Sequence, residues 1–359
     1  MAAARTGAAA GEAEPRRGLG LPTVVLDRWT RFWFRPEPMT ALALVRILFG
    51  LVMVAWAFAL LPNLLTFMGR GGILPDQPSS RYAWGPLQVW HSDQVVIGVW
   101  VLLVLSSAAL AVGWHSRVAA ACVFVCLMTF LRRDTYIFNA GDGLLRIEAL
   151  YLALAPCGSA LSLDRRRTAG SFWDSQVRAP WVIRLMQVQV SIIYLATVRD
   201  KLSGTTWNQG TAVSYALRLP DLRNFPVPGW LSTNALLMNA ATWGTLVVEV
   251  AIGVLVWNRR LRPWVLGAGV VLHLSILLTL AVGFFSWTVW ILYLAFVPPA
   301  TAQRWVDRVR ARLRRPGTST EPADSAEPAG QADPAEPAGP GAEPAAEPAD
   351  AEDAQMPTG

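Results

Sequence analysis

The feature that most constrains this chain is a series of long apolar segments that recur between about residues 41 and 298. Several approach the roughly 20 apolar residues that an α-helix needs to cross a hydrocarbon core of ~30 Å. A backbone in lipid has to satisfy its own hydrogen bonds, which a helix does and an open strand does not. The pattern therefore predicts an all-α, polytopic membrane helix bundle, with the lipid bilayer as its first partner.

The apolar segments predict about eight transmembrane spans. They fall at about 41–61, 94–113, 118–131, 143–157, 181–198, 235–257, 264–282 and 284–298. The third and fourth are short, as tilted or buried spans can be. The composition agrees with a membrane protein, because 53% of the residues are hydrophobic and the mean hydropathy is +0.35, both high for a soluble domain.

Changes in composition divide the chain into four segments. Residues 1–39 are predicted to form a basic interfacial segment, because LDRWTRFWF mixes arginines with aromatic side chains. Residues 40–300 hold the predicted transmembrane domain, and 301–316 a basic juxtamembrane segment. Residues 317–359 combine Pro, Ala and acidic residues with almost no large apolar side chain. Such a composition cannot form a core, so a disordered C-terminal tail is predicted.

The arginines indicate how the chain is oriented. They gather in alternate loops, at 165–167, 259–262 and 304–315. The positive-inside rule then places both termini in the cytoplasm and the loop 199–233 outside, in a multi-pass protein of the cell membrane. Because the excess lies in short loops and no aromatic–basic recognition module is present, the charge indicates orientation and not nucleic-acid binding.

Polar side chains within spans are costly and often functional. Asp142 and Arg146 are four residues apart and can pair on one helix face. Counted at 100° per residue, Gln187, Tyr194 and Lys201 follow one face of the fifth span. Structural roles stay open, since Glu249 could pair with Arg184 or Arg146 and His273 could bond a neighbouring helix. The residues that we consider as liners of an outward-opening cavity are Asp142, Arg146, Gln187, Tyr194, Glu249 and His273.

Lys201 is the only lysine in the chain. One interpretation is that a composition rich in arginine has left one lysine by chance. The other is that arginine cannot replace it, because arginine stays protonated whereas a desolvated lysine can act as a base. The positive charge of Arg199 favours loss of the Lys201 proton, and the negative charge of Asp200 opposes it.

The cysteines and histidines give no metal pattern. Cys122, Cys126 and Cys157 show neither a CxxC nor a Cys/His spacing, so no metal site is predicted.

Three stretches of the chain carry a family resemblance. In order along the sequence, they are GRGGILP, FNAGDGLLRIEALYLALAPCGSALSLD and YLATVRDKLSGTTWNQG. Together with the apolar run after residue 247, they resemble the HTTM (horizontally transferred transmembrane) family, which includes the membrane domain of vitamin K-dependent gamma-carboxylase. In that carboxylase, a lysine followed by leucine and shortly by tryptophan is the base that deprotonates reduced vitamin K. Lys201, Leu202 and Trp207 match this motif. Asn139 stands where the carboxylase has a catalytic histidine, and both Asn139 and Trp207 join the cavity candidates.

The resemblance implies a quinol-linked, carboxylase-like enzyme in which Lys201 is the catalytic base and a menaquinol-like reduced quinone is the cofactor. The alternative is a non-enzymatic accessory for maturation, export or immunity of a secreted peptide, because bacterial members also resemble a protein that helps to mature a secreted toxin. A secreted peptide or protein is then the substrate or the partner. The sequence leaves open whether the chain is an enzyme.

Overall fold

Helices make up nearly all of the regular structure in this computed structural model, which describes residues 21–73, 85–90, 92–134 and 136–314. All of these residues belong to one compact unit, Met1–Arg314. The all-α membrane bundle predicted from the sequence is confirmed. The tail predicted at 317–359 lies outside the described residues, as do residues 1–20 of the predicted N-terminal segment.

Five helices of the described chain are long and apolar enough to cross a membrane by length and composition. The first continues from α2 through a 3-10 turn, η1 (Leu61–Asn63), into α3 (Leu64–Met68). The five are α2 (Thr40–Leu60) with that extension, α5 (Asp93–Val112), α9 (Trp181–Leu202), α13 (Ala235–Leu255) and α14 (Arg262–Thr279). They coincide with the first, second, fifth, sixth and seventh predicted spans.

The other three predicted spans are also helical but do not meet that criterion alone. These are α6 (Ser116–Arg133), α7 (Ala140–Leu154) and α15 (Phe285–Leu294). Three arginines lie within α6, α7 is short and carries three charged residues, and α15 is shorter still. A bend of 104° separates α15 from α16 (Pro299–Arg314), and this pair counts as a sixth span if it is taken as one. The number of spans is therefore lower by this measure than the eight predicted.

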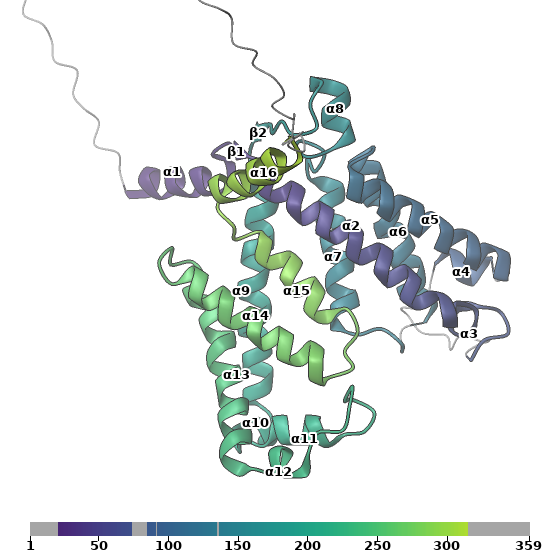
Figure 1. The fold of residues 1–359 in the computed structure, drawn as a ribbon, viewed down its shortest axis with the longest axis vertical. Coiled ribbons are helices and arrows are strands. Elements are labelled where there is room, and N and C mark those ends of the chain that lie inside the picture. Colours follow the sequence, from purple (N-terminus) through teal and green to yellow (C-terminus); the bar gives the residue numbers. More distant parts are fainter. Residues whose placement is uncertain (1–20, 74–84, 91, 135, 315–359) are drawn as a thin grey trace, which may run out of the picture. The chain divides into compact units, whose positions relative to one another are not determined.

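Two groups of packed helices meet at α15. In one group α2 packs on α5, α5 on α6 and α6 on α7, while in the other α13 packs on both α9 and α14. α15 contacts α2 and α7 on one side and α9 and α14 on the other, which Figure 1 shows as the short helix at the centre. Such a helix is surrounded by protein, which explains why it is apolar on nearly all sides.

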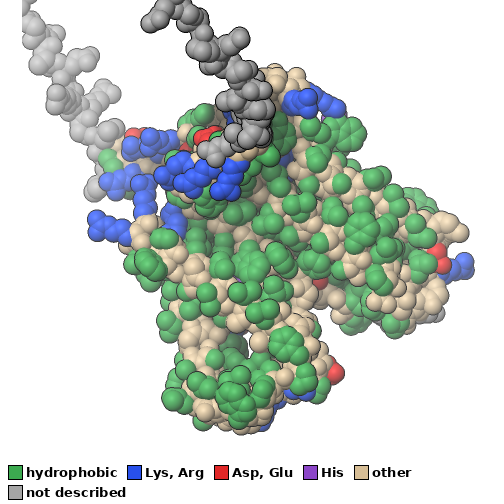
Figure 2. Space-filling view, in the orientation of Figure 1, with side chains coloured by type: hydrophobic (Ala, Val, Ile, Leu, Met, Phe, Trp, Pro, Cys, Tyr) green, Lys and Arg blue, Asp and Glu red, His purple; other side chains and the backbone are tan. Residues whose placement is uncertain are grey.

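The connections gather at two opposite ends of the bundle, as the alternate loops predict. At one end, β1 (Glu37–Pro38) pairs antiparallel with β2 (Val177–Arg178). The same end carries α1 (Leu21–Phe34), α8 (Leu163–Ala169) and α16, and Figure 2 shows most of the visible Lys and Arg side chains there. The other end carries α3, α4 (Pro86–Val89), α10 (Thr205–Asn208), α11 (Ala212–Arg218) and α12 (Gly229–Ser232). That the basic end faces the cytoplasm remains a prediction from the positive-inside rule.

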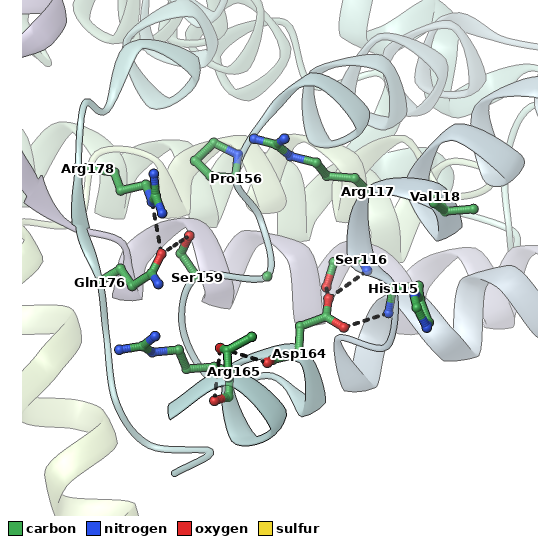
Figure 3. Close-up of a pocket in the computed structure, with 12 residues that line it drawn as sticks. His115, Ser116, Arg117, Val118, Pro156, Ser159, Asp164, Arg165, Gln176 and Arg178 are labelled. Carbon is green, nitrogen blue, oxygen red and sulfur yellow. Dashed lines mark hydrogen bonds between the residues drawn. The ribbon is translucent and has the colours of Figure 1, made fainter. Parts of the chain in front are cut away.

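The turn between α5 and α6 is held by a carboxylate from α8. Asp164 accepts hydrogen bonds from the backbone N–H groups of His115 and Ser116, both at 2.8 Å, and from Ser116 Oγ at 2.7 Å (Figure 3). The first N–H groups of a helix have no partner within it. Asp164 therefore caps α6 from a distant part of the chain and lies at the positive end of its dipole.

A buried arginine packs against the same turn. Arg46 of α2 is fully buried and donates from Nη2 to the carbonyl of Leu161 at 2.5 Å. Gly113 has a φ of 75°, and a Cβ there would lie 1.8 Å from Arg46 Nη1. A larger residue at 113 would thus be strained and would also displace the guanidinium. We did not identify Arg46 from the sequence, although an arginine inside the first apolar segment was a usable signal.

We expect Asp164→Asn to destabilise the protein in a pH-dependent way. Partial burial of Asp164 opposes ionisation, but the hydrogen bonds from Ser116 and His115 outweigh it and hold the pKa of this carboxyl below its usual value. The stabilisation is then present in full above the unfolded pKa of about 3.9 and is lost as the pH falls through the lower folded pKa. The variant should cost about 1 kcal/mol at neutral pH, as the loss of a helix cap does.

Thermal unfolding of the full chain in detergent, near pH ~7 and near pH ~3, measures this effect. The matched control is Asp174→Asn, because Asp174 pairs with Arg165 at the surface and is 44% exposed, so its loss should change little. A deficit in Asp164→Asn that is equally large at both pH values would contradict the capping role of the charge.

Candidate functional site

One face of α9 carries polar side chains along most of its length. Gln187, Tyr194 and Lys201 are spaced seven residues apart, and seven steps of about 100° return to within ~20° of the starting direction. Gln187 and Tyr194 are buried, and Lys201 is half-buried. The periodicity predicted from the sequence is thus present, and each of these side chains faces another element of the bundle.

Lys201, in the last turn of α9, forms an ion pair with Glu249 of α13. The lysine side chain is 24% exposed and the glutamate side chain 9% exposed. Lys201 Nζ also lies 4.6 Å from the ring centroid of Trp207, at the start of the segment that follows α9. A cation between a carboxylate and the face of an indole is stabilised by both. Lys201 is therefore held at the border between the bundle and its surroundings.

A hydrogen-bonded group of two tyrosines and a histidine lies deeper in the bundle. Tyr194 Oη is 2.7 Å from His273 Nε2 in α14 and 2.5 Å from Tyr293 Oη in α15. All three residues are at most 6% exposed. Gly269 leaves the room for this contact, because a Cβ there would lie 2.5 Å from Tyr293 Oη. One hydroxyl thus links three helices.

The ion pair and the aromatic group form one polar cluster. Glu249 lies within electrostatic range of the Tyr194 and Tyr293 hydroxyls, and Lys201 within range of His273. Two buried atoms of the cluster, Glu249 Oε2 and His273 Nδ1, have no hydrogen-bond partner among the described residues. Buried polar atoms are normally paired, so the cluster has the capacity to bind a further polar group.

Of the residues proposed from the sequence, the structure brings together Tyr194, Lys201, Trp207, Glu249 and His273. The sequence analysis missed Tyr293, although a tyrosine hydroxyl inside the last apolar segment was a weak signal. Gln187 is not part of the cluster. It lies toward the opposite end of α9, where it donates to the carbonyl of Ala295 at 2.7 Å and accepts from Arg184 at 3.1 Å.

Asn139 and Asp142 have local structural roles at the start of α7. The Asn139 side chain accepts from the backbone N–H of Gly141 at 2.7 Å, and Asp142 accepts from the backbone N–H of Asn139 at 2.9 Å, which together make a capping box. Asp142 also accepts from Trp56 Nε1 at 2.7 Å. Asn139 also donates from Nδ2 to the carbonyl of Val282 at 3.3 Å, and no described hydrogen bond or ion pair links either residue to the polar cluster.

Three pairings that the sequence left open are not formed among the described residues. Asp142 does not pair with Arg146, which forms no ion pair or hydrogen bond with any residue that the structure describes. Glu249 pairs with Lys201, and neither with Arg184 nor with Arg146. Arg184 instead pairs with Glu37 at 2.7 Å. The partners of Asp142, Glu249 and Arg184 are Trp56, Lys201 and Glu37, which come from other elements and are not revealed by spacing along a single helix.

Two cavities in the described part of the chain lie at the basic end of the bundle. One, of about 430 Å³, is shown in Figure 3 and is lined by residues of the α5–α6 turn, α8 and the segment before α9. The other, of about 760 Å³, is lined by Gln187 among others. Neither is lined by Lys201, Tyr194 or His273. The outward-opening cavity expected beside Lys201 therefore corresponds to neither of them.

A family model for the HTTM domain matches residues 34–300. This match covers most of the chain and contains every member of the polar cluster. The chain belongs to the HTTM family. No significant match is found among curated proteins or among solved structures. The resemblance seen in the sequence is confirmed at the level of the family, and this HTTM protein is an integral membrane protein.

We expect the Lys201–Glu249 pair of this HTTM domain to be energetically coupled. Lys201→Met leaves the buried Glu249 carboxylate without its counter-ion, and removing one partner of a buried pair costs about 3–5 kcal/mol, less where one partner is partly exposed. The double variant Lys201→Met/Glu249→Leu removes both charges and should recover part of the melting temperature that the single variant loses. Thermal unfolding in detergent of both single variants and the double variant measures the coupling. Strictly additive losses would contradict it.

Proposed function

We propose that this HTTM protein acts on a small, weakly acidic and largely apolar molecule of the reduced-quinone class, with Lys201 as the general base. The observation that carries the proposal is the position of Lys201 Nζ, which contacts both Glu249 and the Trp207 ring while its side chain stays 24% exposed. A general base has to lie within reach of its substrate, and its surroundings have to stabilise the proton that it receives. The HTTM family membership, through its resemblance to the carboxylase membrane domain, supports the same assignment.

The side chains beside Lys201 support a hydroxyl-bearing ring as the ligand. Glu249 Oε2 and His273 Nδ1 are buried and have no partner among the described residues, so each offers an atom to a polar group. Trp207 offers an aromatic face next to Lys201. A reduced quinone bound here would supply a weakly acidic hydroxyl, and its oxidation by oxygen would supply the driving force implied by the carboxylase resemblance.

Lys201 and Glu249 can pass a proton between them. The ion pair places the Lys201 ammonium against the Glu249 carboxylate. Transfer of one proton from Nζ to Glu249 leaves a neutral amine and a neutral carboxyl, which a water-poor site tolerates better than two separated charges. The neutral amine can then take a proton from a hydroxyl. Arginine cannot do this, because its guanidinium keeps its proton at any accessible pH.

A second function is favoured by the same ion pair. If Lys201 only ties α9 to α13, the protein needs no base, and the alternative is a non-enzymatic accessory for the maturation, export or immunity of a secreted peptide. Lys201 and Glu249 are in direct contact, which is what a purely structural tie between the two helices requires, and this supports the alternative. The two functions differ in whether Lys201→Arg, which keeps the positive charge, retains function.

Oxygen uptake on adding reduced menaquinone to the purified, detergent-solubilised protein tests the proposal. We expect uptake by the wild type and a loss of about 10²-fold or more in both Lys201→Ala and Lys201→Arg, as for removal of a general base. The matched control is Arg218→Ala, because Arg218 is an exposed cation of the loop region that follows α9 and lies outside the polar cluster, and its loss should leave the rate unchanged.

Two results would contradict the enzyme proposal. One is no uptake above background by a folded wild-type protein, and the other is full activity in Lys201→Arg. Either result would favour the accessory function, for which co-purification with a secreted peptide or its processing partner is the expected observation.

A further inference from the structure

The larger cavity, of about 760 Å³, lies at the basic end of the bundle, away from Lys201. Its walls come from the start of α2, the start of α9, the turn between α13 and α14, and the junction of α15 with α16. Arg184 and Lys201 stand near opposite ends of α9, and 17 residues of helix at 1.5 Å per residue separate them by about 25 Å. The cavity is therefore a site separate from the polar cluster, and its role does not depend on the proposed function.

Three arginines line this cavity with a single carboxylate. Arg184 is matched, because it pairs with Glu37 at 2.7 Å and also donates to Gln187 and to the carbonyl of Phe32, both at 3.1 Å. Arg259 and Arg262 have no acidic partner among the described residues. The cavity thus holds an excess of positive charge, which an anion would balance.

The two unmatched arginines differ in how they are held. Arg262 donates to the carbonyls of Val256 at 2.9 Å and Phe296 at 3.3 Å, which fixes its guanidinium at the cavity wall. Arg259 is exposed and forms no hydrogen bond or ion pair with any described residue. All of its donors are therefore available, and a planar guanidinium matches the oxygens of a phosphate.

The rest of the cavity is apolar. Its lining includes Met39, Leu42, Ile183, Leu266, Phe296 and Trp305. A free phosphate would leave this surface uncovered, whereas an amphiphile would cover it with hydrocarbon while its headgroup meets the arginines. The bend of 104° between α15 and α16 turns the basic α16 across the bundle end at this place (Figure 1). The site is thus charged at one part and apolar at the other, as is the boundary between lipid headgroups and acyl chains.

We propose that this cavity binds an anionic phospholipid, with the phosphate at Arg259 and Arg262 and the upper acyl chains along the apolar wall. Basic pockets between membrane helices are attractive to anionic headgroups, because each nearby cation adds to the attraction of the negatively charged leaflet. Arg259 contacts the headgroup directly, and Arg262 both contacts it and joins the α13–α14 turn to the end of α15. Bound lipid would then brace the junction of these helices.

Native mass spectrometry of the delipidated full chain tests this site with an equimolar mixture of phosphatidylglycerol and phosphatidylcholine that have the same acyl chains. We expect retained lipid to be mainly phosphatidylglycerol. Arg259→Gln should lower its affinity about tenfold, as expected for the loss of one charge-assisted contact. The matched control is Arg260→Gln, because Arg260 is a neighbouring exposed cation that does not line the cavity, and it should bind as the wild type does.

Several outcomes would overturn the proposal. Equal retention of the two lipids, or an equal loss in Arg259→Gln and Arg260→Gln, would mean that no specific site for an anionic headgroup exists. Displacement of phosphatidylglycerol by inorganic phosphate at matched concentration would assign the site to free phosphate. If Arg259→Gln does not fold, Arg259→Lys keeps the charge and should retain most of the preference. Lys201→Ala should bind lipid normally, so failure here is distinct from failure of the proposed function.

Discussion

Charged side chains between membrane helices are stable only where a counterpart lies close by, and in this chain the ion pair of Lys201 with Glu249 meets that requirement between α9 and α13. Lipid tails are as apolar as the helix surfaces, so burial of leucine does little to decide which faces meet. The polar side chains instead determine which helix faces meet. One face of α9 must turn toward α13, and this rotation also directs Tyr194 toward His273 and Tyr293.

The central position of α15 follows from the same hydrogen bonds. Tyr293 contributes the hydroxyl that meets Tyr194, and Ser286 donates to the backbone carbonyl of His273 at 2.9 Å. α15 therefore joins α9 and α14 through side chains, and its other surface packs on α2 and α7. Since α15 is too short to cross a membrane by itself, it depends on these contacts, and the two helix groups depend on it in turn.

The sequence was sufficient to predict where the helices lie, because apolar length and charge spacing are properties of local segments. It also predicted the face of α9 that carries Gln187, Tyr194 and Lys201, since a regular helix fixes the angle between residues seven apart. Partner choice could not be predicted. Glu249 and Lys201 are separated by 48 residues, and only the packing of α13 on α9 determines that they meet. Asn139 differs, because its capping of α7 is a local contact that a polar residue directly before a helix can indicate.

The two ends of α9 show why arginine and lysine are not interchangeable in this bundle. At one end Arg184 donates to Phe32, Gln187 and Glu37 at once, which requires the several donors of a rigid guanidinium. At the other end Lys201 meets one carboxylate and the face of one indole. Charge alone does not require lysine there, since arginine pairs with carboxylates and stacks on aromatic rings equally well or better. Under the proposed function, what lysine adds is a proton that a neighbouring carboxylate can accept, and the single lysine of the chain would then have a chemical reason for its place.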